Sequence, residues 1–204
     1  LVGSEMCIRD RSYAIEGRGS RNYVEVKKMM HNRPDLWAQL MEKLVQQLVS
    51  YLHLQIRAGV EAVQLFDTWV GNLSIQDYTT FVHPYLEKML QLLGNAAPVI
   101  YFGTGNSHLL PSVSTLPFDV LAFDWRTPLV PTWEQLGCKA VQGNLDPIIL
   151  CAGQHAIGQQ AGQLLNEVAG RGGHIFNLGH GIIPETPVDN VKFLVDFVHQ
   201  HSAG

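Results

Sequence analysis

The sequence lacks three features that would assign it to a special class of protein. Its 204 residues include only three cysteines, and none of them has the CxxC or HxC spacing of common zinc sites, which argues against a disulfide framework or an evident metal site. Positive charge is not in excess, since the formal net charge is −4, whereas nucleic-acid binders usually show a basic face. No apolar run reaches the roughly 18 residues that a membrane span requires. We therefore expect a globular protein of a reducing compartment that binds neither nucleic acid nor membrane.

The composition is otherwise ordinary, because 46% of the residues are hydrophobic. A chain of this length buries a substantial core without disulfides or metals. Cys138 and Cys151 are accordingly expected to be small buried apolar groups.

The first eleven residues, LVGSEMCIRDR, differ from the rest of the chain. They mix charges with isolated apolar residues and show no period, and Glu5 interrupts any apolar segment of the kind that a secretory signal needs. The stretch resembles the adapter-derived leaders found in translated metagenomic reads. We expect residues 1–11 to be a non-native leader and residues 12–204 to form one partial barrel domain.

From residue 34 onward, long helical patterns alternate with short apolar segments that are rich in strand formers. The expected strands lie near residues 62–66, 98–102, 119–123, 139–142 and 174–177. The expected helices open at Asn32–Pro34 and end near Gly59, run from Ser74 to Gly94, run from Gly153 to Ala169, and begin at Thr186–Pro187. This alternation is typical of parallel βαβ units, because parallel neighbours need a long crossover connection.

Polar and glycine residues gather at the carboxyl ends of these strands, where a (β/α)8 barrel places its active site. A doubly wound open sheet also puts its chemistry at strand ends, so the pattern alone leaves both folds open. No GxGxxG follows the first strand, which weakens the dinucleotide-binding version. A complete (β/α)8 domain takes about 250 residues. Because about 170 residues supply the five strands here, we expect a TIM barrel that is present only as its last five β/α units.

Five strings occur in an order and at a spacing that indicate a family. They are Ser12–Gly17 (SYAIEG), Ala58–Trp69 (AGVEAVQLFDTW), Phe123–Trp125 (FDW), Val141–Pro147 (VQGNLDP) and Phe176–Ile182 (FNLGHGI). Each string is weak by itself, but together they closely resemble the uroporphyrinogen decarboxylase family from residue 12 to about residue 202.

The resemblance implies a (β/α)8 barrel enzyme, a carboxy-lyase that is usually a homodimer in the cytoplasm or plastid and works without a cofactor. The family removes carbon dioxide from the four acetate side chains of uroporphyrinogen, an anionic tetrapyrrole of porphyrin and haem biosynthesis, and so forms coproporphyrinogen. Three residues match its site motifs: Tyr13 and His180 as catalytic and substrate-binding groups, and Thr68 as a substrate-binding group.

These residue types suit a substrate with eight carboxylates. His180 can be cationic near neutral pH, and its flanking glycines permit close approach. Tyr13 and Thr68 add hydroxyl donors without charge. The resemblance also implies an aspartate on an early strand and arginines in an RQAGR-type motif, neither of which occurs in this sequence. We therefore expect the 204-residue chain alone to be inactive.

Other polar residues at strand ends keep two interpretations. Asp67, Asp124 and Arg126 are either functional groups or salt bridges at the barrel mouth. The string Gly103–Asn106 resembles a phosphate nest, but its spacing fits no phosphate loop and turn chemistry is favoured. Arg18 departs from the family pattern, which often has glycine there.

Two rival functions remain open. The first is a zinc- or corrinoid-dependent methyltransferase of the same barrel superfamily, which would need a thiolate-and-histidine metal set. The second is a non-catalytic fragment, whose open edge strands would be prone to association.

Overall fold

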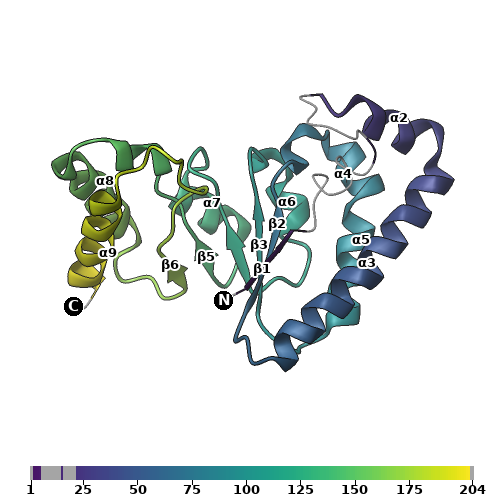
Figure 1. Cartoon of the computed structure of the whole chain (residues 1–204), viewed down its shortest axis with the longest axis horizontal. Helices are drawn as coiled ribbons and strands as arrows, with labels where there is room; N and C mark the ends of the chain where they lie inside the picture. Colours follow the sequence, from purple (N-terminus) through teal and green to yellow (C-terminus); the bar gives the residue numbers. More distant parts are fainter. Residues whose placement is uncertain (1, 6–14, 16–21, 203–204) are drawn as a thin grey trace. The chain divides into compact units, whose positions relative to one another are not determined.

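The computed structural model describes residues 2–5, 15 and 22–202 of the chain (Figure 1). The chain divides into two compact units, Leu1–Leu121 and Ala122–Gly204. Each unit is an α/β assembly of its own. The prediction of one partial barrel domain over residues 12–204 concerns the combination of the two units, and it stays a prediction.

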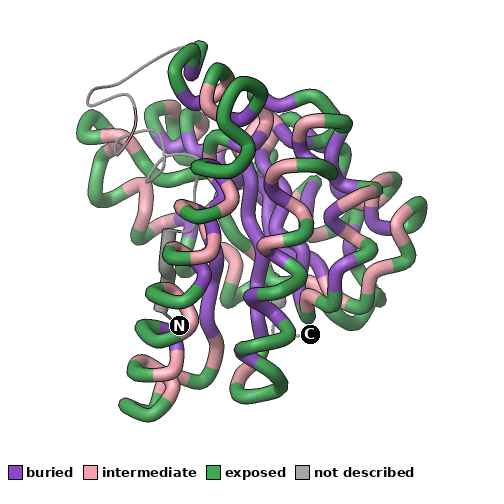
Figure 2. The backbone as a smooth tube through the Cα atoms, turned by 90° about the vertical axis from the view of Figure 1, so that its right-hand side faces the viewer, coloured by how far each residue is buried: buried purple, intermediate pink, exposed green. Residues whose placement is uncertain are grey.

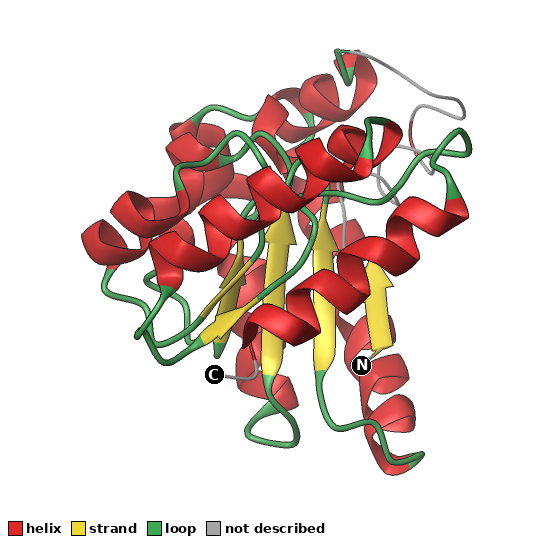
Figure 3. Cartoon of the chain, turned by 90° about the vertical axis from the view of Figure 1, so that its left-hand side faces the viewer, coloured by secondary structure: helices red, strands yellow, loops and turns green. Residues whose placement is uncertain are grey.

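The first unit is built on three parallel strands that lie in chain order (Figure 3). Its elements are β1 (Val2–Glu5), α2 (Val24–Asn32), α3 (Pro34–Arg57), β2 (Val63–Asp67), η1 (Val70–Asn72), α4 (Ile75–Phe81), α5 (His83–Leu93), β3 (Val99–Gly103), η2 (Ser107–Leu109) and α6 (Leu110–Val113). The register pairs Val63 with Val99 and Asp67 with Gly103. The carboxyl ends of β2 and β3 therefore meet at one edge of the sheet.

The second unit follows the short strand β4 (Val120–Ala122), whose residues span the boundary. Its further elements are α7 (Leu129–Leu136), β5 (Val141–Gln142), η3 (Pro147–Cys151), α8 (Gln154–Val168), β6 (His174–Ile175) and α9 (Val188–Ser202). Strands β5 and β6 are parallel, and the Leu145–Leu178 bridge extends their pairing. The backbone N–H of Phe123 donates to the Gln142 carbonyl at 2.9 Å, so the chain leaving β4 lies beside β5.

Helix boundaries follow local chemistry, and two of them correct the sequence-based expectation. Pro34 opens α3 as expected, but Asn32 is the last residue of α2 rather than the cap of α3. Ser74 caps α4 by accepting a hydrogen bond from the Asp77 N–H. The single helix expected from there to Gly94 is broken at Val82, because a proline stands in the first turn of α5 and favours a new helix start.

Burial separates the strands from the outer helices (Figure 2). Four of the five residues of β2 and all of β3 are buried, as expected for strands covered on both faces. Helix α3 packs beside α5 (Figure 1) and buries one face through Trp37, Met41, Val45 and Leu52. Strand β6 is less covered, with Ile175 42% exposed. Within the described residues it pairs with β5 alone, which explains the difference.

The predicted parallel α/β class is confirmed, and each of the five expected strands is present as β2 to β6. Strand β1 is an addition, because it lies in the stretch that the sequence marks as a leader. It pairs with β2 through backbone groups, and an uncovered strand edge accepts such pairing with little demand on sequence. That residues 1–11 are non-native stays a prediction.

Candidate active site

The three residues that match the family's site motifs lie in different parts of the chain. Tyr13 falls outside the residues that the structure describes. Thr68 belongs to the first unit, where it directly follows β2, and His180 belongs to the second unit, where it follows β6. Thr68 and His180 therefore both lie beyond the carboxyl ends of parallel strands, which is where the sequence pattern placed the chemistry.

Thr68 stands between a buried carboxylate and an exposed indole. Asp67 is 1% exposed, and its Oδ2 accepts a hydrogen bond of 3.2 Å from the Tyr101 hydroxyl. Thr68 itself is half-buried, and Trp69 is exposed. Because Tyr101 lies within β3, this hydrogen bond ties the end of β2 to its neighbour and fixes the backbone that carries Thr68.

Two glycines let the loops after β2 and β3 interlock. A Cβ on Gly71 would lie 2.5 Å from the Gly105 carbonyl oxygen and would also strike that of Thr104. A Cβ on Gly103 would collide with the amide of Asn106, a side chain that is fully buried. Gly105 has a φ of 63°, a conformation that favours glycine. The string Gly103–Asn106 is thus a packed turn, as its composition indicated.

His180 is exposed at the tip of the NLGHG string and contacts Trp125. The two rings meet edge to face, with centroids 6.0 Å apart and planes at 90°. Gly179 makes this contact possible, because a Cβ there would lie 2.8 Å from the Trp125 Cα and strike its backbone nitrogen. The Phe123–Trp125 and Phe176–Ile182 strings, which are far apart in sequence, therefore pack directly on each other. Sequence reasoning identified Trp125 as part of a motif but missed its role as the support of His180.

Asp124 organises the turn that holds Trp125. Its carboxylate is 1% exposed, and its Oδ1 accepts from the Arg126 N–H at 3.1 Å and from the Thr127 hydroxyl at 3.2 Å. Its Oδ2 accepts from Arg126 Nη1 at 3.1 Å. The buried amide of Asn144 donates to the Asp124 and Thr127 carbonyls at 2.8 and 2.7 Å. Asn144 of the VQGNLDP string therefore fixes the turn of the FDW string through hydrogen bonds. Asp124 stabilises the same turn through the hydrogen bonds that it accepts from Arg126 and Thr127.

His174 also braces the second unit, and sequence reasoning missed it. Its Nε2 lies 2.7 Å from the Gly143 carbonyl, to which the neutral ring donates. Partial burial lowers the pKa of His174 from its ordinary value of 6.5, and the hydrogen bond to Gly143 offsets part of that shift. The folded state thus disfavours the protonated ring.

Acidification is expected to destabilise the second unit through His174. The unfolded chain binds a proton on His174 more readily than the folded chain does. His174 therefore has no effect on the free energy of unfolding above its ordinary pKa of 6.5, and it lowers that free energy as the pH falls below 6.5. Urea unfolding at about pH 7.5 and about pH 5.5 checks this, because His174→Gln should lose less stability between the two conditions than the unsubstituted chain. His199→Gln, on the exposed end of α9, is the control. An equal loss in the His174→Gln and unsubstituted chains would contradict the assignment.

The cysteines correct one expectation. Cys138 is only half-buried and Cys151 is exposed, so neither is the buried apolar group that the composition suggested. Cys151 is the last residue of η3, and its side chain is exposed although Leu150 beside it is buried. Partial burial raises the pKa of the Cys138 thiol.

Among the described residues, no three His, Cys, Asp or Glu side chains gather closely enough to hold a metal ion.

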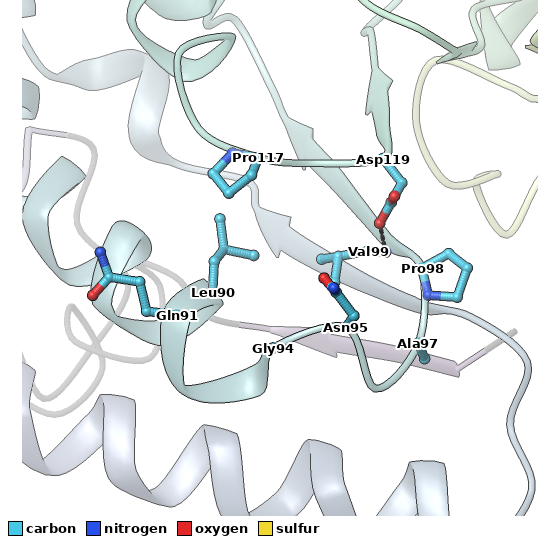
Figure 4. Close-up of a pocket in the computed structure, with 9 residues that line it drawn as sticks. All are labelled: Leu90, Gln91, Gly94, Asn95, Ala97, Pro98, Val99, Pro117 and Asp119. Carbon is cyan, nitrogen blue, oxygen red and sulfur yellow. Dashed lines mark hydrogen bonds between the residues drawn. The ribbon is translucent and has the colours of Figure 1, made fainter.

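A cavity of about 440 Å³ lies where strand β3 of the first unit begins, at the end opposite to Thr68 (Figure 4). Its lining includes Asn95, Val99 and Asp119, and the Asp119 carboxylate accepts a hydrogen bond of 2.8 Å from the Val99 N–H. Val99 begins β3, whereas the loop with Thr68 lies beside the end of that strand. This cavity is therefore separate from the motif residues.

Within the described chain, no helix has the length and apolar character needed to cross a bilayer.

The described strands and the motifs at their carboxyl ends define a parallel α/β protein. A solved methyltransferase from Methanosarcina mazei shares this fold, with a TM-score of 0.75 over 86% of this chain and 52% of that chain at 20% identity. That likeness shows the fold alone, and it supports the predicted (β/α)8 class.

Sequence comparison identifies the family. The profile of the uroporphyrinogen decarboxylase family (URO-D) matches residues 11–201, so the chain belongs to that family. The uroporphyrinogen decarboxylase of Koribacter versatilis is 48% identical over 195 residues, covering 94% of this chain and 56% of that protein. Those of Sorangium cellulosum and Thermus thermophilus are 47% and 44% identical, covering 92% and 94% of this chain. The chain spans 54% and 57% of these two relatives.

Proposed function

We propose that this chain supplies part of the active site of an enzyme that decarboxylates the four acetate side chains of uroporphyrinogen to give coproporphyrinogen. The observation that carries the proposal is the packing of Gly179 and His180 on Trp125, because it joins two family strings in one unit and leaves the imidazole exposed to a ligand. The family membership over residues 11–201 supports the same reaction.

The reaction requires hydrogen-bond donors that bind the substrate carboxylates and a group that accepts the electron pair of the breaking bond. Protonation of a pyrrole carbon makes a cation that accepts the electron pair of the breaking bond between the acetate methylene and its carboxylate. Carbon dioxide leaves, and the methylene carbon then takes a proton to become a methyl group while the ring loses the proton it gained. On the family motifs, we assign His180, Thr68 and Tyr13 to carboxylate binding, and His180 and Tyr13 also to catalysis.

The remaining features of the enzyme are proposed on the family resemblance. They are a homodimer, a cytoplasmic location and the absence of a cofactor. The aspartate and RQAGR arginines that the family uses do not occur in this sequence. We therefore expect the 204-residue chain alone to form no detectable coproporphyrinogen.

A chimera tests the function. Residues 12–204 replace the matching segment of the Koribacter versatilis relative, which is 48% identical over 195 residues, and the product from uroporphyrinogen is analysed by liquid chromatography. We expect coproporphyrinogen from the chimera and none from the chain alone. A folded chimera that leaves uroporphyrinogen unchanged would contradict the proposal, and stoichiometric zinc in it would favour the methyltransferase alternative.

A further inference from the structure

The turn after β4 presents an arginine whose side chain is held in place from two sides. Arg126 Nη1 lies 3.1 Å from Asp124 Oδ2, and the guanidinium carbon lies 4.0 Å from the centroid of the Trp125 ring. The Arg126 side chain is nevertheless 55% exposed, whereas the Asp124 side chain is 1% exposed. A cation is therefore fixed against the protein while it still faces solvent.

Fixing this side chain matters more for binding than for stability. An ion pair with an exposed cation adds little to folding, because solvent screens it and the long side chain loses conformational freedom. Asp124 already accepts hydrogen bonds from the Arg126 backbone N–H and the Thr127 hydroxyl, so its burial does not depend on the guanidinium alone. A prearranged side chain, in contrast, loses less entropy when a ligand binds.

The geometry leaves part of the guanidinium available to an anion. Its contact with Asp124 is made through Nη1 alone, whereas a guanidinium can make paired hydrogen bonds to a carboxylate. Within the described part of the chain, Nε and Nη2 form no hydrogen bond. These groups are the donors that a ligand carboxylate would use.

Trp125 links this cation to His180. One indole ring carries the guanidinium on its face and meets the imidazole edge to face at 6.0 Å between centroids. Two side chains that can donate to carboxylates thus share one rigid support within a single unit. A substrate that carries several carboxylates can engage both.

We propose that Arg126 is a substrate-binding and specificity-determining residue, which pairs with one carboxylate of the tetrapyrrole while His180 engages another. This inference rests on the proposed function. It assigns Arg126 to affinity for the anionic substrate rather than to the bond-breaking step, so its loss should act on KM more than on kcat.

Kinetics of the chimera with uroporphyrinogen test the assignment. Arg126→Gln should raise KM about tenfold or more, because the substrate carboxylate loses its charge-assisted hydrogen bonds to the guanidinium, with kcat changed by less than about threefold. The KM of Arg126→Lys should lie between that of the unsubstituted chimera and that of Arg126→Gln, because lysine keeps the charge but lacks the planar guanidinium. The matched control is Arg171→Gln, which removes an arginine of the same unit that pairs with Glu134 at 2.7 Å. It should leave both constants unchanged.

Salt dependence separates binding from a structural role. KM of the unsubstituted chimera should rise with ionic strength, and the rise should be smaller in Arg126→Gln. An unchanged KM in Arg126→Gln, or a fall in kcat with a lowered melting temperature and the same salt dependence, would overturn the assignment. An unsubstituted chimera that is folded but inactive would overturn the proposed function and this inference with it, whereas an active chimera with a silent Arg126→Gln would overturn the inference alone.

Discussion

Gly179→Ala is expected to lower kcat/KM of the chimera about a hundredfold, because it displaces the loop that we propose binds the substrate, and a shift of about 1 Å in such a loop has effects of that size. The added Cβ would lie 2.8 Å from the Cα and 2.9 Å from the Cβ of Trp125, and it would strike the Trp125 backbone nitrogen. Backbone cannot rotate out of the way as a side chain can. The NLGHG loop must therefore move and carry His180 away from Trp125.

The same substitution should destabilise the 204-residue chain by about 1–3 kcal/mol, the usual cost of overpacking. Thermal and urea unfolding measure this loss. Gly181→Ala is the matched control, because a Cβ at that position meets no atom within 4 Å although it flanks His180 on the other side. Equal behaviour of the two alanine variants would contradict the contact between Gly179 and Trp125.

Gly71→Ala is expected to produce the second-largest effect, in the first unit. Its Cβ would lie 2.5 Å from the carbonyl oxygen and 2.6 Å from the carbonyl carbon of Gly105, again on backbone. The loops after β2 and β3 would separate, and the segment that carries Thr68 would shift. We expect a loss of about 1–3 kcal/mol in stability and a fall of about tenfold or more in kcat/KM of the chimera.

Gly172→Ala is the control for Gly71→Ala, since its Cβ also meets no atom within 4 Å. Urea unfolding of the 204-residue chain and steady-state kinetics of the chimera give the two readouts. If Gly71→Ala unfolds at the same urea concentration as Gly172→Ala, the close packing of Gly71 against the loop after β3 is contradicted.

The sequence predicted the strands well because their signal is local. Runs such as Val99–Gly103 combine strand-forming residues with burial on both faces, and each expected run is a strand. Two of the elements that were missed illustrate two different causes. Strand β1 depends on backbone pairing with β2. The short helix Leu129–Leu136 contains a proline and has too few residues to show a clear helical period.

The candidate site was only partly predictable for a related reason. Motif strings located Thr68 and His180 at strand ends, and the structure places both there. No periodicity reveals that Gly179 packs on Trp125, since that contact joins residues far apart in the chain. Asp124 likewise kept two interpretations until its hydrogen bonds to Arg126 and Thr127 gave it a structural task.

The central proposal is that Thr68, after β2 in the first unit, and His180, after β6 in the second, each bind a carboxylate of uroporphyrinogen. The most direct test is the kcat/KM of the chimera for uroporphyrinogen after Thr68→Val and after His180→Gln, with melting temperatures measured alongside. We predict a loss of about tenfold or more for each variant, since Thr68→Val removes a hydroxyl donor and His180→Gln replaces the imidazole that packs on Trp125 with a flexible, uncharged amide. The melting temperatures show that each variant is folded under the assay conditions. Full activity in both variants would contradict the claim.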